Sequence, residues 1–180
     1  MFFLVYALMQ FPTGVLVDRV GTRVTAAVGA AVMNVGVLWF VIAGGYGSAL
    51  VGRFLIGLGG SVIFVSLLRF CANWYEVSEA GTMTGLSFGA GGIGGILATT
   101  PFAVAVDAAG WRTTLFALGI VGLALAGLTF LLVRDSAERA GLSPIENVPE
   151  QSLLSLPEVR SYLRDVLGDR WTWVVSVLLY

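Results

Sequence analysis

The chain has 180 residues, of which 57% are hydrophobic and only 12% are charged. A soluble domain carries about twice that share of charge, so the composition indicates a membrane protein. The net charge of −1 gives no electrostatic basis for binding nucleic acid, and the absence of histidine together with a single cysteine excludes a His/Cys zinc site and a disulfide framework within this chain.

Apolar segments follow one another along most of the chain, and a bilayer is crossed by about 20 helical residues. The first segment covers residues 1–17, and we expect it to be shortened at its start. Four further spans are predicted at 24–43, 48–68, 82–106 and 113–133. Another apolar stretch covers residues 171–180. The sequence therefore predicts an all-α, polytopic helical bundle over residues 1–133 and the start of a further transmembrane helix over 171–180.

The stretch 134–170 is the only long polar part of the sequence, and we expect it to be a central cytoplasmic loop. Ser155 and Glu158 have the spacing of a capping box, in which the serine caps a helix and the glutamate reaches back. The helix that follows is expected to be amphipathic and to lie along the membrane surface. A flexible linker is the alternative.

Basic residues favour alternate connections between the predicted spans. They follow the first, third and fifth spans, at Arg19, Arg23, Arg69, Arg134 and Arg139. The positive-inside rule assigns such loops to the cytoplasm. We therefore expect an integral, multi-pass protein of the plasma membrane with these three connections on the cytoplasmic side.

The turn after the first span carries a spaced set of small and charged residues. The set consists of Gly14, Asp18, Arg19, Gly21 and Arg23. Charge between two apolar spans must lie at the membrane surface or be paired, and Asp18 could accept hydrogen bonds from the N–H groups of a neighbouring helix start.

This spacing resembles the loop between the second and third helices of the major facilitator superfamily, Gly-x-Leu-x-Asp-Arg-x-Gly-Arg-Arg/Lys. Thr22 departs from it, because the family usually has arginine there. In that family the cluster acts as a latch that favours one conformational state. A positive-inside anchor without further function is the alternative.

Arg53 and Gly57 lie within the predicted third span. They resemble the family's fourth-helix motif, in which an arginine is followed by glycine four residues later. Placing an arginine inside a span costs free energy unless the side chain is paired or hydrated, so its presence there indicates a functional role. In the family the matching arginine is linked to proton coupling or to the charge of the cavity. The alternative is that Arg53 only extends its charged group to the outer interface.

The predicted fourth span is rich in glycine. Gly85, Gly89 and Gly94 match the family's fifth-helix motif, but Ala90 replaces its proline and Ile93 replaces a glycine. The motif therefore favours close packing of helices rather than antiport.

Other polar residues within the spans could face a cavity. They are Gln10, Asn34, Ser61 and Ser66. The sequence assigns no substrate contact among them. Residues 133–146 resemble the segment after the sixth helix in carriers of organic phosphates and carboxylates, which leans weakly toward an organic anion as substrate.

The resemblance implies a partial N-terminal half of the family fold, with helices two to six and the start of helix seven. A fragment of a secondary active transporter is the function it implies, moving a small solute by alternating access. Its partners would be the lipid bilayer, the solute and the remainder of the transporter, and it would use a proton or ion gradient in place of a cofactor. The alternative is a non-transporting structural or assembly subunit. We expect no enzyme, because the sequence has no nucleophile–base pair, metal cluster or phosphate-binding loop.

Overall fold

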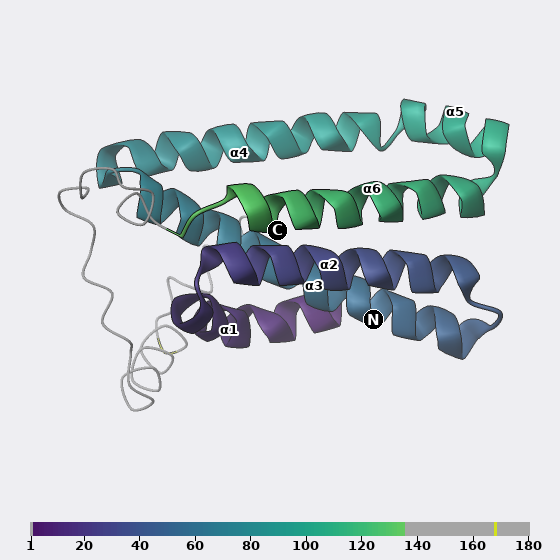
Figure 1. The fold of residues 1–180 in the computed structure, drawn as a ribbon, viewed down its shortest axis with the longest axis horizontal. Helices are drawn as coiled ribbons and strands as arrows, with labels where there is room; N and C mark the ends of the chain where they lie inside the picture. The colour runs from purple at the N-terminus through teal and green to yellow at the C-terminus, as the bar shows by residue number, and fades with distance from the viewer. Residues whose placement is uncertain (1, 136–167, 169–180) are drawn as a thin grey trace. The chain divides into compact units, whose positions relative to one another are not determined.

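The computed structural model describes residues 2–135 and residue 168, and its six α-helices all lie between residues 2 and 135 (Figure 1). They are α1 (Phe2–Val20), α2 (Thr22–Ile42), α3 (Tyr46–Trp74), α4 (Val77–Leu97), α5 (Thr100–Ala109) and α6 (Trp111–Leu132). The chain divides into two compact units, Met1–Val148 and Pro149–Tyr180, and the helices belong to the first. The expected capping box, surface helix and final span lie outside the described residues.

The all-helical class predicted from the sequence is confirmed, but the fourth predicted span is not one helix. It starts earlier, at Val77, and it is interrupted between α4 and α5. At the interruption Thr99 has non-helical angles (φ −98°, ψ −97°), and its N–H donates to the carbonyl of Ile96 over 3.1 Å. Pro101 explains the break, because proline has no N–H to donate to the carbonyl of Leu97 four residues earlier and its ring would clash with that carbonyl in a continuous helix.

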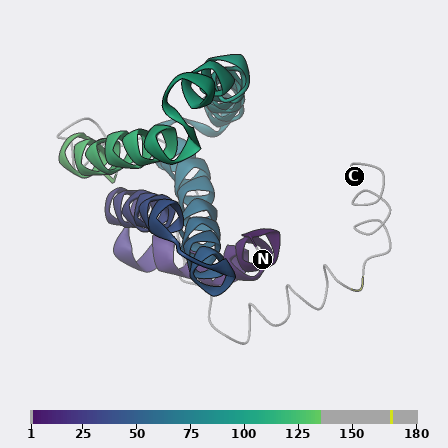
Figure 2. The same ribbon diagram turned by 90° about the vertical axis from the view of Figure 1, so that its right-hand side faces the viewer.

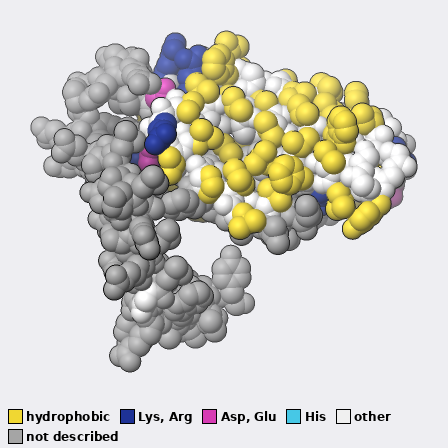
Figure 3. Space-filling model, turned by 90° about the horizontal axis from the view of Figure 1, so that it is seen from below, with side chains coloured by type: hydrophobic (Ala, Val, Ile, Leu, Met, Phe, Trp, Pro, Cys, Tyr) yellow, Lys and Arg dark blue, Asp and Glu magenta, His cyan; other side chains and the backbone are white. Residues whose placement is uncertain are grey.

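Length and composition suit several of these helices to crossing a membrane. Among the described residues, four segments meet that requirement: α2, α3, α4 together with α5, and α6. The shorter α1 ends in Asp18 and Arg19. Figure 3 shows hydrophobic side chains along the flank of the bundle, with the charged side chains gathered toward its two ends. This distribution matches a bundle surrounded by lipid.

The helix α2 is the centre of the described bundle. It packs mainly against α3 and then against α6, while α1 packs on α3. In both ribbon views α4 and α5 lie at the edge farthest from α1 (Figures 1 and 2). They contact α3 and α6 much less, so the core lies between α1, α2, α3 and α6.

A seam of glycines lets α2 and α3 approach closely. Gly29 and Gly36 of α2 face Gly52 and Gly59 of α3, and the members of each pair are seven residues apart. A Cβ atom at Gly36 would lie 2.8 Å from the backbone nitrogen of Ile56. Because lipid tails are as apolar as leucine, small residues that permit backbone contact hold membrane helices together. The seven-residue spacing of these glycines could have indicated the seam, but it was not used in the prediction from sequence.

The glycine-rich face of α4 has a different environment. A Cβ atom at Gly85, Gly89 or Gly94 would meet no atom within 4 Å, so the described helices provide no partner for this face. Its expected close packing stays a prediction. A cavity of about 570 Å³ lies beside it, lined by residues of α4, α5 and α6 from Gly94 to Leu118.

Candidate functional site

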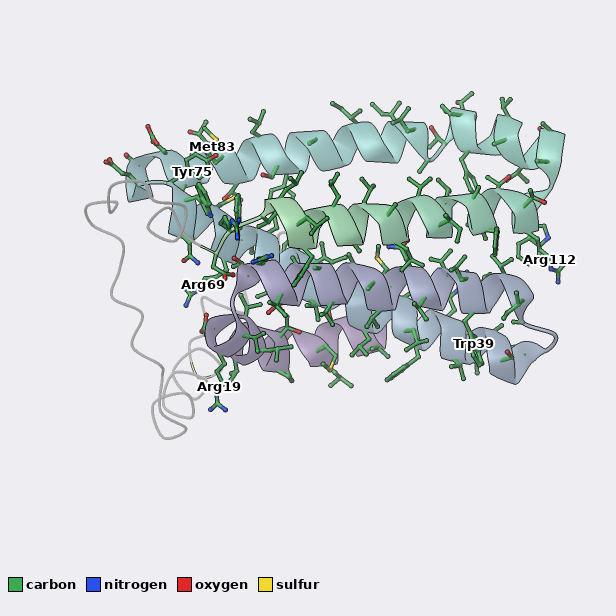
Figure 4. All side chains as sticks on the ribbon, in the orientation of Figure 1. Arg19, Trp39, Arg69, Tyr75, Met83 and Arg112 are labelled. Carbon is green, nitrogen blue, oxygen red and sulfur yellow. The ribbon has the colours of Figure 1, made fainter. Side chains whose placement is uncertain are left out.

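Charged side chains gather at the two ends of the bundle (Figure 4). Arg19 and Arg69 lie at one end, which we call the latch end because it holds the turn between α1 and α2. Arg112 lies at the opposite end, beside the turn between α5 and α6.

The predicted latch residues lie mostly on the two helices that flank the turn. Gly14, Asp18 and Arg19 belong to α1, Arg23 lies in the first turn of α2, and only Gly21 stands between the helices. Gly21 has φ +94°, a conformation that residues with a side chain rarely adopt. The tight turn therefore fixes the direction in which the two helices leave the latch end.

Asp18 contacts a different partner from the one expected. Its carboxylate forms an ion pair with Arg69 near the end of α3, at an N–O distance of 2.5 Å. Arg69 Nε is buried without a hydrogen-bond partner, and the guanidinium contacts Asp18 through Nη2. A cavity of about 280 Å³ adjoins the pair, and Gly14 forms part of its wall.

We expect the ion pair between Asp18 and Arg69 to contribute little to stability. The side chains are 36% and 32% exposed, respectively, and such pairs contribute about 0–1 kcal/mol. Asp18→Asn in the intact protein should therefore lower the free energy of unfolding by less than about 1 kcal/mol, measured by thermal unfolding in detergent. A double-mutant cycle with Arg69→Gln isolates the pair, and a coupling energy well above that range would contradict this expectation.

Arg23 joins the start of α2 to the end of α6. Its Nε donates to the carbonyl of Phe130 over 2.6 Å, and its guanidinium lies 4.5 Å from the centre of the Phe130 ring. A cation at a helix C-terminus is favourable because the last carbonyls carry partial negative charge. The contact links two helices within the described bundle.

Arg53 is the eighth residue of α3, about 10 Å along the helix from its first residue. Its side chain is exposed in the described bundle, and its guanidinium lies 4.9 Å from the centre of the Phe40 ring. The Phe40 ring also packs against Trp111, at 6.2 Å between centroids. Gly57, one turn further along α3, is buried. The guanidinium thus lies on an aromatic ring, and the side chain is exposed in the described bundle.

Three buried polar residues of the spans are satisfied within their own helices, whereas the buried hydroxyl of Thr13 in α1 has no hydrogen-bond partner in the described structure. Asn34, Ser61 and Ser66 each donate to a backbone carbonyl three or four residues earlier. Arg53 is exposed, whereas these three polar side chains are buried. The side chain of Gln10 lies outside the described part of the structure.

Arg112 makes a structural contact at the opposite end of the bundle that the sequence did not indicate. Its Nε donates to the carbonyl of Val41 at the end of α2, over 3.3 Å. It also lies 4.3 Å from the centre of the Trp111 ring. The pair α2 and α6 is therefore linked by arginines at both ends.

Comparison with known proteins agrees with a polytopic helical membrane protein. The chain matches the family model of the Major Facilitator Superfamily over residues 1–180. It belongs to this superfamily, and it is a multi-pass integral membrane protein.

Several curated transporters are similar to the chain. A probable hexose phosphate transport protein of Chlamydia muridarum is 25% identical over 97% of this chain and 42% of its own length. A probable sulfoacetate transporter of Cupriavidus necator is 29% identical over 74% of this chain and 31% of its own length. A nitrite extrusion protein of Bacillus subtilis is 29% identical over 74% of this chain and 33% of its own length. The chain thus spans less than half the length of these relatives.

Proposed function

We propose that this chain is part of the N-terminal half of a secondary active transporter that moves a small anion by alternating access. Family membership supports transport, and the relatives support the class of substrate. Hexose phosphate, sulfoacetate and nitrite, which the relatives' names give, are all anions. A transporter for such solutes needs a fixed cation where the solute leaves water, because an unpaired charge is costly inside a membrane.

Arg53 is the observation that carries the anion proposal. Arg53 is the eighth residue of α3, its side chain is exposed, and the Phe40 ring holds the guanidinium from one side. Guanidinium groups bind carboxylate, phosphate and sulfonate oxygens with two parallel N–H donors. Arg53 would thus attract the anion into the pathway, and a proton or ion gradient would drive the cycle.

The latch end supplies the conformational part of the proposal. Asp18, Arg19 and Arg23 would stabilise one state of the cycle, and this end would face the cytoplasm of a cell whose plasma membrane holds the protein. Alternating access in such folds is a rocking of one half against the other around a central site. The tight turn at Gly21 would keep the latch charges in register during that motion.

Uptake by the intact protein in proteoliposomes tests the proposal. The panel would hold a hexose phosphate, a sulfonate, a uronate and nitrite, with glucose as the neutral control. We expect saturable, gradient-dependent uptake of at least one anion and none of glucose. Absence of uptake for every solute would favour the structural-subunit alternative, and uptake of glucose alone would contradict the anion class.

A further inference from the structure

The start of α2 receives its cap from a residue that lies far along the chain, just after α6. The residue in the N-cap position is Gly21, which has no side chain and makes no side-chain cap hydrogen bond. A carboxylate oxygen of Asp135 accepts the backbone N–H of Arg23 over 2.8 Å, although Asp135 lies 112 residues later in the chain. The same oxygen lies 3.4 Å from the hydroxyl of Thr22, which donates to it.

The carboxylate of Asp135 lies beside Gly21, where the φ of +94° already favours glycine. A Cβ atom there would lie 2.6 Å from that same oxygen of Asp135, closer than such atoms approach. The carboxylate therefore occupies the space that a side chain at this position would fill. A negative group at a helix N-terminus pairs with the free N–H groups and with the positive end of the helix dipole.

The backbone next to Asp135 is fixed by α3. Asn73 Nδ2 donates to the carbonyl of Asp135 over 3.4 Å. Trp74 Nε1 donates to the carbonyl of Arg134 over 3.0 Å. Both donors lie at the end of α3, one turn beyond the Arg69 that pairs with Asp18. The segment after α6 is thus held by α3 and itself holds α2.

We propose that Asp135 is a positioning residue for the latch: it caps α2 and sets the turn between Asp18 and Arg23. The inference rests on the proposed function, because the latch is a device of a transport cycle. Arg134 and Asp135, which follow α6, contact both α2 and α3. Loss of the cap therefore frees the start of α2 and changes the positions of Asp18 and Arg23 relative to each other. The anion site near Arg53 lies toward the opposite end of α3 and keeps its contacts.

The test uses the intact protein with Asp135→Ala, Asp135→Asn and the control Asp107→Ala. Asp107 is an exposed carboxylate near the end of α5, away from the latch end. Hydrogen exchange of the first turn of α2 is measured by mass spectrometry, and initial uptake rates give the maximal rate and KM. We expect Asp135→Ala to speed exchange at α2 at least about fivefold and to lower the maximal rate with KM unchanged, because removal of a cap opens a helix end locally.

Asparagine keeps an acceptor oxygen, so the exchange rate in Asp135→Asn should lie within about twofold of that in the unsubstituted protein. The control Asp107→Ala should exchange at the same rate as the unsubstituted protein. Unchanged exchange in Asp135→Ala would overturn the cap. Faster exchange with an unchanged maximal rate, or a change confined to KM, would overturn the positioning role. If the unsubstituted protein shows no uptake, the proposed function and the positioning role fail together, and the exchange measurement still decides the cap.

Discussion

Gly59→Ala is expected to destabilise the intact protein by about 2 kcal/mol or more. A Cβ atom at Gly59 would overlap the carbonyl oxygen of Gly29 and the backbone of Met33, and neither is the flexible end of a side chain. The helices α2 and α3 would therefore have to move apart, and the contacts along the seam would weaken. Thermal unfolding in detergent, followed by circular dichroism, measures the change.

Gly127→Ala is the matched control for this substitution. Gly127 also lies inside an α-helix, but a Cβ atom there would meet nothing within 4 Å. Its effect should stay within about 0.5 kcal/mol of the unsubstituted protein. Equal losses for Gly59→Ala and Gly127→Ala would show that loss of helical glycine, and not the close approach of α2 and α3, governs stability.

Neutralising Arg53 is expected to give the largest loss of transport. Arg53→Gln should lower the initial rate of anion uptake at least about tenfold, equivalent to about 1.4 kcal/mol, because the solute would lose its guanidinium partner. Arg53→Lys should retain an intermediate rate, since the charge remains but the planar pair of donors is lost. Uptake of the anion identified in proteoliposomes provides the measurement.

Arg112→Gln is the control for charge at that end of the bundle. Arg112 lies over Trp111 and contacts the end of α2, so its loss removes a positive charge without touching Arg53. We expect uptake to fall less than about twofold, as for most exposed substitutions. If Arg53→Gln retains more than half of the rate, the arginine only extends its charge to the interface, and the anion proposal loses its support.

Local sequence patterns were sufficient for the helical class and for the position of the charged turn. Long apolar runs specify membrane helices because the bilayer leaves no other partner for the backbone N–H and C=O groups. The break in the fourth span was also readable from Pro101, although the sequence reasoning treated 82–106 as continuous. The error came from weighing hydrophobicity alone over that range.

The partners of the charged residues could not be read in the same way. Asp18 pairs with Arg69, whereas the carboxylate that caps a helix start is that of Asp135. Nothing near Gly21 in the sequence indicates Asp135, because the contact exists only once α6 has packed along α2. The same holds for Phe40 beneath Arg53, where two helices must cross before the ring can meet the guanidinium.

The sequence by itself thus determined a polytopic helical bundle and the turn with Asp18, Arg19 and Arg23, because hydrophobicity, helix length and local charge are properties of neighbouring residues. Only the tertiary structure decided which glycines carry the packing and which carboxylate caps α2. Gly29, Gly36, Gly52 and Gly59 are buried in a seam, while among the described residues no atom lies within 4 Å of a Cβ atom built at Gly85, Gly89 or Gly94. Their sequence patterns are similar, and the difference arises from which helix faces are brought into contact.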